Sequence, residues 1–241
     1  MKFNSSPTIV AGLVSFAVGG AVLADSATAP EMRFSMSIGG NLCTWTDSWG
    51  VSAGGPYWAY NDSYEAPGGS MMYQLLVDPD PILGFDLGFT NTTETDQDFH
   101  IVLSLPVAPF SGGTKIGGMI SGSLVDESED GFAAVSSVGT LPIFDATIDD
   151  VTWLTLFDSP FQALVTEVGG TTEIGPDADG LPGTSKDGPF VVQDLISVEL
   201  NFRLSAGDTV WFNGIFIVEY VPAPPAALLL VGLIAKRRRR N

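Results

Sequence analysis

Acidic residues gathered in turns are the first groups in the sequence that could do chemistry. Asp126 and Asp130 lie in a run that begins like a calcium loop, and Asp177 and Asp179 precede a glycine in a second acidic turn. Calcium prefers carboxylate and carbonyl oxygens. Ser137 stands where an EF-hand loop has its bidentate glutamate, so the motif is incomplete. Two interpretations stay open: a structural calcium ion held by some of these four aspartates, or solvated acidic loops between strands.

Aromatic residues are concentrated between residues 45 and 73, with three of the five tryptophans and four of the five tyrosines. Apolar faces of sugar rings stack on aromatic side chains, while nearby carboxylates and amides bind hydroxyl groups. Such a composition is typical of a small-ligand site. The same rings could instead pack beneath a loop or over the end of a sheet, because aromatic side chains bury a large area. The candidate ligand-binding residues are Trp45, Trp49, Tyr57 and Trp58.

Residues for nucleophilic catalysis are scarce. A Ser-His-Asp site would have to use His100, the single histidine, and the chain has no Gly-x-Ser-x-Gly elbow. The single cysteine excludes an intrachain disulfide framework. A carboxylate pair for glycoside hydrolysis stays possible, but the 28 acidic residues single out no pair. The sequence therefore predicts no catalytic residue and no cofactor beyond the calcium hypothesis.

Apolar and polar residues alternate with period 2 through most of residues 25–221. We therefore expect β-strands to position the candidate residues. Every second residue from Ile196 to Leu204 is apolar, and Thr209–Tyr220 is apolar on both faces, as in a central strand. We expect these two segments to form a hairpin through Ser205–Asp208. A second hairpin is expected where Phe85–Phe89 and Phe99–Leu105 flank a polar stretch.

Many short strands separated by turn residues indicate a sandwich or a barrel. The expected fold is all-β, a single antiparallel β-sandwich of jelly-roll type spanning residues 25–221. Gly169–Pro189 is expected to be a long loop. No segment of the body shows a helical repeat, although Phe161–Val168 could form a helical turn or two. Further strands are expected at Met32–Ile38, Met71–Val77, Ile116–Val125, Phe132–Val138, Ile143–Ile148 and Val151–Phe157.

The two ends of the chain have the composition of targeting segments. Residues 1–24 have one cation, an apolar run and a small-residue cleavage site, which predicts a secretory signal peptide removed after Ala24. The tail, residues 222–241, begins within the proline-rich run Val221-Pro222-Ala223-Pro224 and continues with an apolar stretch and a terminal cation cluster. That cluster ends in Arg237, Arg238, Arg239 and Arg240.

This tail resembles the PEP-CTERM sorting signal of proteins exported by Gram-negative bacteria, with Ala223 where that family has glutamate. The resemblance implies processing by an exosortase-like enzyme, together with a secretory signal peptidase for the N-terminus. It also implies an association with exopolysaccharide and biofilm. A simple C-terminal membrane anchor is the alternative, with the cations on the cytoplasmic side. Both interpretations place residues 25–221 outside the inner membrane, at the cell surface or beyond it.

Charge narrows the choice of partners. The chain has a net charge of −18, and its body keeps only four cations against all 28 acidic residues, a net charge of −24. Such a surface repels nucleic acid. We therefore expect an exported, non-enzymatic cell-surface or matrix protein. The alternative is a carbohydrate-binding module using residues 45–73, and an exported hydrolase is the least favoured. The cations of the body are Arg33, Lys115, Lys186 and Arg203.

Overall fold

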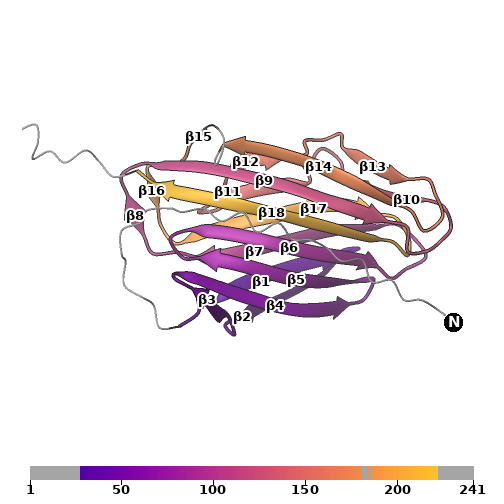
Figure 1. Ribbon diagram of the computed structural model, residues 1–241, viewed down its shortest axis with the longest axis horizontal. Coiled ribbons are helices and arrows are strands. Elements are labelled where there is room, and N and C mark those ends of the chain that lie inside the picture. Colours follow the sequence, from indigo (N-terminus) through magenta and orange to yellow (C-terminus); the bar gives the residue numbers. More distant parts are fainter. Residues whose placement is uncertain (1–27, 181–183, 185, 222–241) are drawn as a thin grey trace, which may run out of the picture.

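The computed structural model describes residues 28–180, 184 and 186–221 (Figure 1). Several predicted features lie outside these residues: the signal peptide with Ala24, and the tail with Pro222, Ala223, Pro224 and the cations 237–240. Val221 is described, and its N–H donates to the carbonyl oxygen of Gly113 at 3.1 Å. Within the described ranges, no helix has the length and apolar character needed to cross a membrane.

The described chain is all-β, with two antiparallel sheets packed face to face, which confirms the predicted sandwich (Figure 1). Alternation of apolar and polar residues gives each sheet one buried face. Sheet A runs in the order β12 (Val151–Leu156), β11 (Phe144–Ile148), β17 (Leu195–Leu204), β7 (Gln97–Pro106), β1 (Met32–Ile38) and β2 (Asn41–Asp47). It also includes β10 (Ala133–Ser136), which pairs with β17 and with β13 (Gln162–Val165).

Sheet B is the layer that matters for the site described below. It runs in the order β14 (Thr171–Gly180), β9 (Thr114–Val125), β18 (Thr209–Tyr220), β6 (Ile82–Asn91), β5 (Gly69–Asp78), β4 (Tyr57–Ala66) and β3 (Val51–Gly54). A short strand, β15 (Lys186–Asp187), also pairs with β9. A separate pair joins β8 (Phe110–Ser111) to β16 (Val191–Val192).

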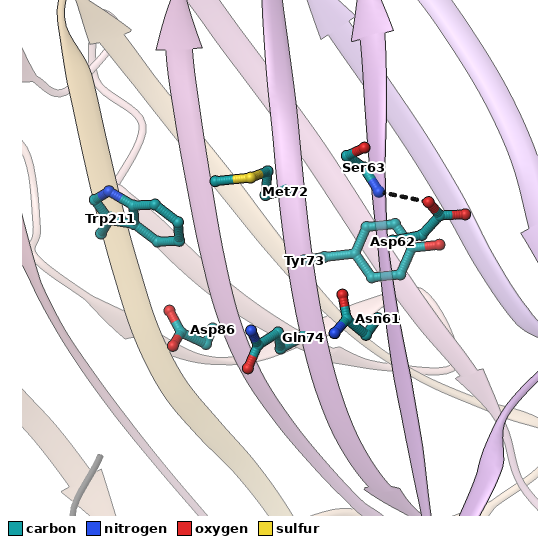
Figure 2. A pocket seen from close by; sticks show the side chains of 8 residues that line it. All are labelled: Asn61, Asp62, Ser63, Met72, Tyr73, Gln74, Asp86 and Trp211. Carbon is teal, nitrogen blue, oxygen red and sulfur yellow. Dashed lines mark hydrogen bonds between the residues drawn. The ribbon is translucent and has the colours of Figure 1, made fainter. Parts of the chain in front are cut away.

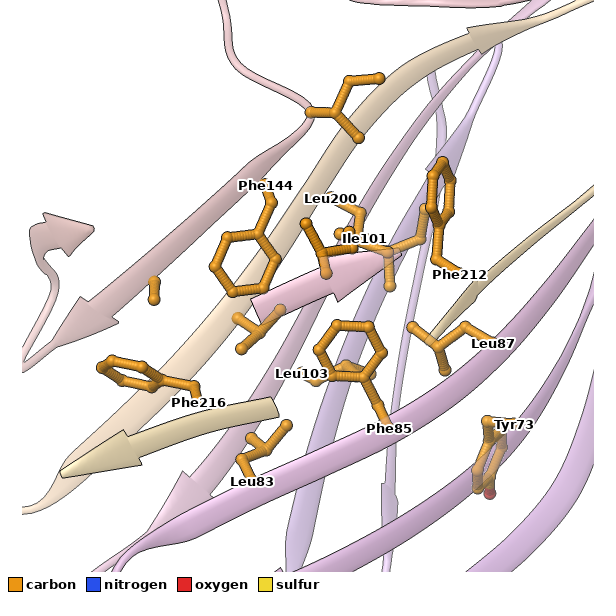
Figure 3. Close-up of a cluster of buried hydrophobic side chains, with 14 of the residues drawn as sticks. Tyr73, Leu83, Phe85, Leu87, Ile101, Leu103, Phe144, Leu200, Phe212 and Phe216 are labelled. Atoms are coloured by element: carbon orange, nitrogen blue, oxygen red, sulfur yellow. The ribbon is translucent and has the colours of Figure 1, made fainter. Parts of the chain in front are cut away.

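The core lies between the two sheets and is rich in phenylalanine (Figure 3). Phe202 of sheet A stacks on Phe99 at 5.1 Å between ring centroids and meets Phe212 of sheet B edge-on at 5.3 Å. All three rings are almost completely buried. Full burial of such a side chain stabilises the fold by roughly 1.5–3 kcal/mol. The core therefore fixes the two sheets against each other and leaves their outer faces free for other roles.

Neither of the two predicted hairpins forms, although their strands do. β17 lies in sheet A between β11 and β7, whereas β18 lies in sheet B between β9 and β6. β6 and β7 likewise belong to opposite sheets. Alternation shows which side of a strand faces the core but not which strand lies beside it. A short polar loop can turn within one sheet or cross to the other, and here both loops cross.

The two crossings are joined at one end of the sandwich. Asn91, at the end of β6, is fully buried, and its side-chain amide donates to the carbonyl oxygens of Leu204 at 3.1 Å and Ser205 at 2.9 Å. Its backbone N–H donates to the carbonyl oxygen of Asp208 at 3.0 Å. One side chain thus ties the end of the first crossing strand to the turn of the second.

One other prediction of local structure is wrong, because residues 169–189, expected as a loop, contain β14. Residues 161–168, where a helical turn could have formed, contain β13 instead. β14 lies at an edge of sheet B, so Ile174 is its single fully buried residue and the hydrophobic pattern is lost. By contrast, β1 has the predicted bounds, and β18 occupies a central position in its sheet, as predicted.

Candidate binding groove on the outer face of sheet B

Most of the aromatic side chains between residues 45 and 73 pack within the fold, and few of them are exposed. Trp45 on β2 is stacked between Phe34 and Tyr64, at centroid distances of 5.0 and 4.3 Å and with each pair of planes 6° apart. Trp58 is half-buried and packs against the core. Trp49 is different, because 89% of its surface is exposed. Tyr57 is half-buried on β4.

Two tyrosines of this segment are anchored by their hydroxyl groups. Tyr73 donates to Asp47 at 3.0 Å, and Tyr60 donates to the carbonyl oxygen of Pro30. Burial, with a smaller contribution from Asp47, raises the pKa of Tyr60 to about 12. Burial and the hydrogen bond to Asp47 also raise the pKa of Tyr73. Both phenols therefore stay protonated as structural donors.

The aspartates proposed for calcium already have partners within the chain. Asp126 is buried and accepts hydrogen bonds from the N–H groups of Gly131 at 2.9 Å and Gly169 at 3.0 Å. Burial alone would raise the pKa of Asp126, but these donors and the Ser128 hydroxyl outweigh it and hold the pKa below its usual range. The Asp130 carboxylate accepts the N–H of Phe132 at 2.8 Å.

The other two calcium candidates lie on β14. Asp177 accepts the N–H of Phe157 at 2.7 Å, and Asp179 forms an ion pair with Lys186 at 2.6 Å. In the part of the chain that the structure describes, no three His, Cys, Asp or Glu side chains come together in an arrangement that could hold a metal ion.

An open groove of about 310 Å³ lies on the outer face of sheet B (Figure 2). It crosses β4, β5, β6 and β18, so residues far apart in the sequence meet there. The side chain of Tyr73 points into the core, so this residue contributes mainly backbone. The lining residues are Asn61, Asp62, Ser63, Met72, Tyr73, Gln74, Asp86 and Trp211.

Strand register explains how these side chains come together. Asn61 is paired with Gln74, and Gln74 is paired with Asp86, so the three form one polar row across β4, β5 and β6. Next to it, Met72 lies in register with Gly88, and Gly88 with Trp211. Directly paired residues point to the same face of a sheet, so the two rows form a polar strip beside an apolar one.

Gly88 determines where the tryptophan ring lies. A Cβ atom at position 88 would stand 2.7 Å from two atoms of the six-membered ring of Trp211. The ring therefore lies against the glycine backbone of the neighbouring strand and is half-buried. An aromatic ring held at a sheet surface in this way offers a flat apolar contact to a ligand.

The electrostatics of the groove are acidic. Asp86 is the carboxylate that faces the groove, because Asp62 is paired with Tyr73 and lies on the opposite face of the sheet. No lysine, arginine or histidine is among the lining residues. Burial raises the pKa of Asp86 above its usual value. With two amides, a hydroxyl and an aromatic ring nearby, the groove can donate and accept several hydrogen bonds while stacking on an apolar face.

The groove and the predicted ligand-binding residues overlap only in their sequence segment. Asn61, Asp62 and Tyr73 belong to the predicted region, but Trp45, Trp49, Tyr57 and Trp58 do not line the groove. Sequence reasoning missed Gln74, Asp86 and Trp211. One signal could have found Trp211, because it is a large aromatic residue on the outward face of a strand whose alternate residues form the core.

No protein-family model matches this chain. No curated protein matches it either.

Proposed function

We propose that the protein is a non-enzymatic polysaccharide-binding protein of the cell surface or extracellular matrix. The observation that carries the proposal is the groove, in which Trp211 lies beside a row of amide and carboxylate side chains. A sugar ring has apolar faces and a rim of hydroxyl groups, so it can stack on the tryptophan while the rim binds the polar row. The absence of cations among the lining residues favours an uncharged glycan over a polyanion.

The location is part of the proposal and rests on the sequence. The segment 1–24, the tail 222–241 and the acidic body support export through the secretory signal peptidase. The tail then engages an exosortase-like enzyme or holds the protein in the inner membrane with its body outside. Intact-mass and terminal-peptide mass spectrometry on fractionated cells tests this. A chain starting near Asp25 and ending near Pro222 supports sorting and release, and recovery of the Arg-rich end from the membrane fraction supports anchoring instead.

Binding is tested by affinity gel electrophoresis of the full chain in gels containing hydroxyethylcellulose, xylan or galactomannan. We expect at least one neutral polysaccharide to retard the wild type, and Trp211→Ala to remove most of the retardation. Gln74→Ala, at an exposed position, provides a second test with little risk to folding. Trp49→Ala is the matched control, because it removes a tryptophan that is 89% exposed and lies outside the groove.

Each outcome has a distinct meaning. Loss of binding in Trp49→Ala alone would move the site to the aromatic segment and overturn the assignment to the groove. Equal retardation of all variants would also overturn it. Release of reducing sugar from the bound polysaccharide would favour the hydrolase hypothesis over a binding module.

A further inference from the structure

The polar row does not stop at the edge of the groove. Asp86 is paired with Asn213 on β18, and Asn213 is paired with Ser121 on β9. The Ser121 hydroxyl donates to the Asn213 side-chain oxygen at 2.7 Å, and the pair is open to solvent. The row therefore crosses five neighbouring strands, from Asn61 to Ser121. Neighbouring strands lie about 4.8 Å apart, so its length is roughly 19 Å.

Apolar rows flank this polar row on both sides. One contains Met72 and the Trp211 ring. The other contains Leu76 and Met119, which are 40% and 37% exposed, with Ile215 between them on β18. Leu76 and Ile215 are both paired with Gly84 on β6, so the sheet surface is low at that position. The outer face of sheet B is thus a polar strip between two apolar shoulders, and it runs across the strands.

The shape and chemistry of this strip select one class of ligand. Asp86 is the one ionisable group of the polar row. The row therefore has no positive charge that could bind a sulfate, a phosphate or a uronate. The long, straight row of donors and acceptors suits an extended chain with hydroxyl groups at regular intervals. Its step of about 4.8 Å per strand is comparable with the length of one pyranose unit.

We propose that an extended, neutral polysaccharide lies across the strands of sheet B, along the row from Asn61 to Ser121, with roughly one sugar unit per strand. This inference rests on the proposed function and extends its site beyond the groove. Asn213 and Ser121 become distal binding residues that contact only ligands long enough to reach them, while Trp211 and Gln74 contact every ligand.

The test uses the full chain and oligosaccharides of two to six units, from the cello-, xylo- or manno- series of whichever polysaccharide retards the wild type. Isothermal titration calorimetry should show an affinity that rises with each unit and levels off at about five. The double variant Asn213→Ala/Ser121→Ala should bind the disaccharide as the wild type does and lose roughly tenfold in affinity for the five- and six-unit ligands. Thr44→Ala/Thr46→Ala, two exposed positions on β2 of sheet A, is the matched control.

The results separate this inference from the proposed function. An affinity that is constant beyond the disaccharide, or a distal double variant that binds six units like the wild type, overturns the orientation across the strands. Both leave the groove intact if Trp211→Ala still loses binding. Unchanged binding in Trp211→Ala overturns the proposed function itself. Far-ultraviolet circular dichroism checks that each variant keeps its strands.

Discussion

The six-membered ring of Trp211 lies so close to Gly88 that a Cβ atom on residue 88 would stand 2.7 Å from it. Gly88→Ala must therefore move the ring, and a side chain at the sheet surface can swing away from the added methyl group at little cost to the fold. We expect the variant to bind polysaccharide several-fold more weakly and to melt within a few degrees of the wild type. Affinity electrophoresis and a thermal melt measure the two effects.

Tryptophan fluorescence gives that variant an internal check. Displacement of Trp211 into solvent should shift the emission to longer wavelength. Wild-type binding in Gly88→Ala despite such a shift would show that the position of the ring does not matter to the site.

We expect the ionised carboxylate of Asp86 to lower the stability of the fold and to strengthen polysaccharide binding. Burial raises its pKa, so the ionised carboxylate destabilises the native state near neutral pH, and this penalty fades as the pH falls through the raised value. Asp86→Asn should therefore raise the melting temperature at pH 7 and lower the affinity for polysaccharide. A variant that is less stable at pH 7 would contradict the assignment.

A second carboxylate, on the outer face of sheet A, gives a prediction of pH dependence. Burial, followed by the charges of Glu199 and Asp158, raises the pKa of Asp145 to about 6. The unfolded value is about 3.9, so ionisation of Asp145 opposes folding at pH 7, and protonation relieves this between about pH 6 and pH 4. Asp145→Asn should be more stable than the wild type at pH 7, with the difference shrinking towards pH 4. Urea unfolding at several pH values measures it, and a difference independent of pH would refute the prediction.

Asn91 should be among the most sensitive positions in the fold. Its amide donates to three carbonyl oxygens, those of Thr95, Leu204 and Ser205, and no part of the residue is exposed. Asn91→Ala removes this donor from the carbonyl oxygens of Leu204 and Ser205, whose bonds to Asn91 are buried, and each buried unsatisfied group costs about 1–3 kcal/mol. We expect a loss of at least about 2 kcal/mol in the free energy of unfolding, measured in urea. Thr44→Ala, at an exposed strand position, should change it very little.

Asp126 tests the calcium hypothesis. Its pKa is lowered, so its stabilising contribution is present above the unfolded pKa and is lost as the pH falls through the folded one. Because N–H and O–H donors of the chain already bind this carboxylate, Asp126→Asn should lower the melting temperature equally in calcium and in chelator. A melting temperature of the wild type that rises with calcium, and fails to rise in the variant, would establish a metal site.

The sequence predicts strands well and strand neighbours poorly, for a physical reason. Alternation from Ile196 to Leu204 records which residues enter the core, and that prediction of a strand is confirmed. Pairing depends on contacts between strands distant in the sequence, such as β17 with β7, and local patterns carry no record of them. The local pattern therefore predicts an in-plane turn at Ser205–Asp208, where the chain crosses from sheet A to sheet B.

The groove could likewise be predicted only in part, because it depends on which strands are neighbours. Trp211 contacts Gly88 only because β18 lies beside β6. The order of strands in the assembled sheet is not encoded in either segment alone. The sequence did indicate that residues near Asn61 combine polar and aromatic character, and these supply one wall of the groove. The opposite wall lies about 150 residues further along the chain.

The position of β18 has a mechanical consequence for a protein held through its C-terminal end. This strand ends at Tyr220 and is hydrogen-bonded along its length to β9 on one side and to β6 on the other. A pulling force entering at Val221 would act along the strand and load both ladders in shear. The bonds would then share the load, whereas a strand at the sheet edge pulled sideways would unzip bond by bond. If the proposed tail holds the protein at the membrane, a pull on β18 would therefore be shared by two hydrogen-bonded ladders.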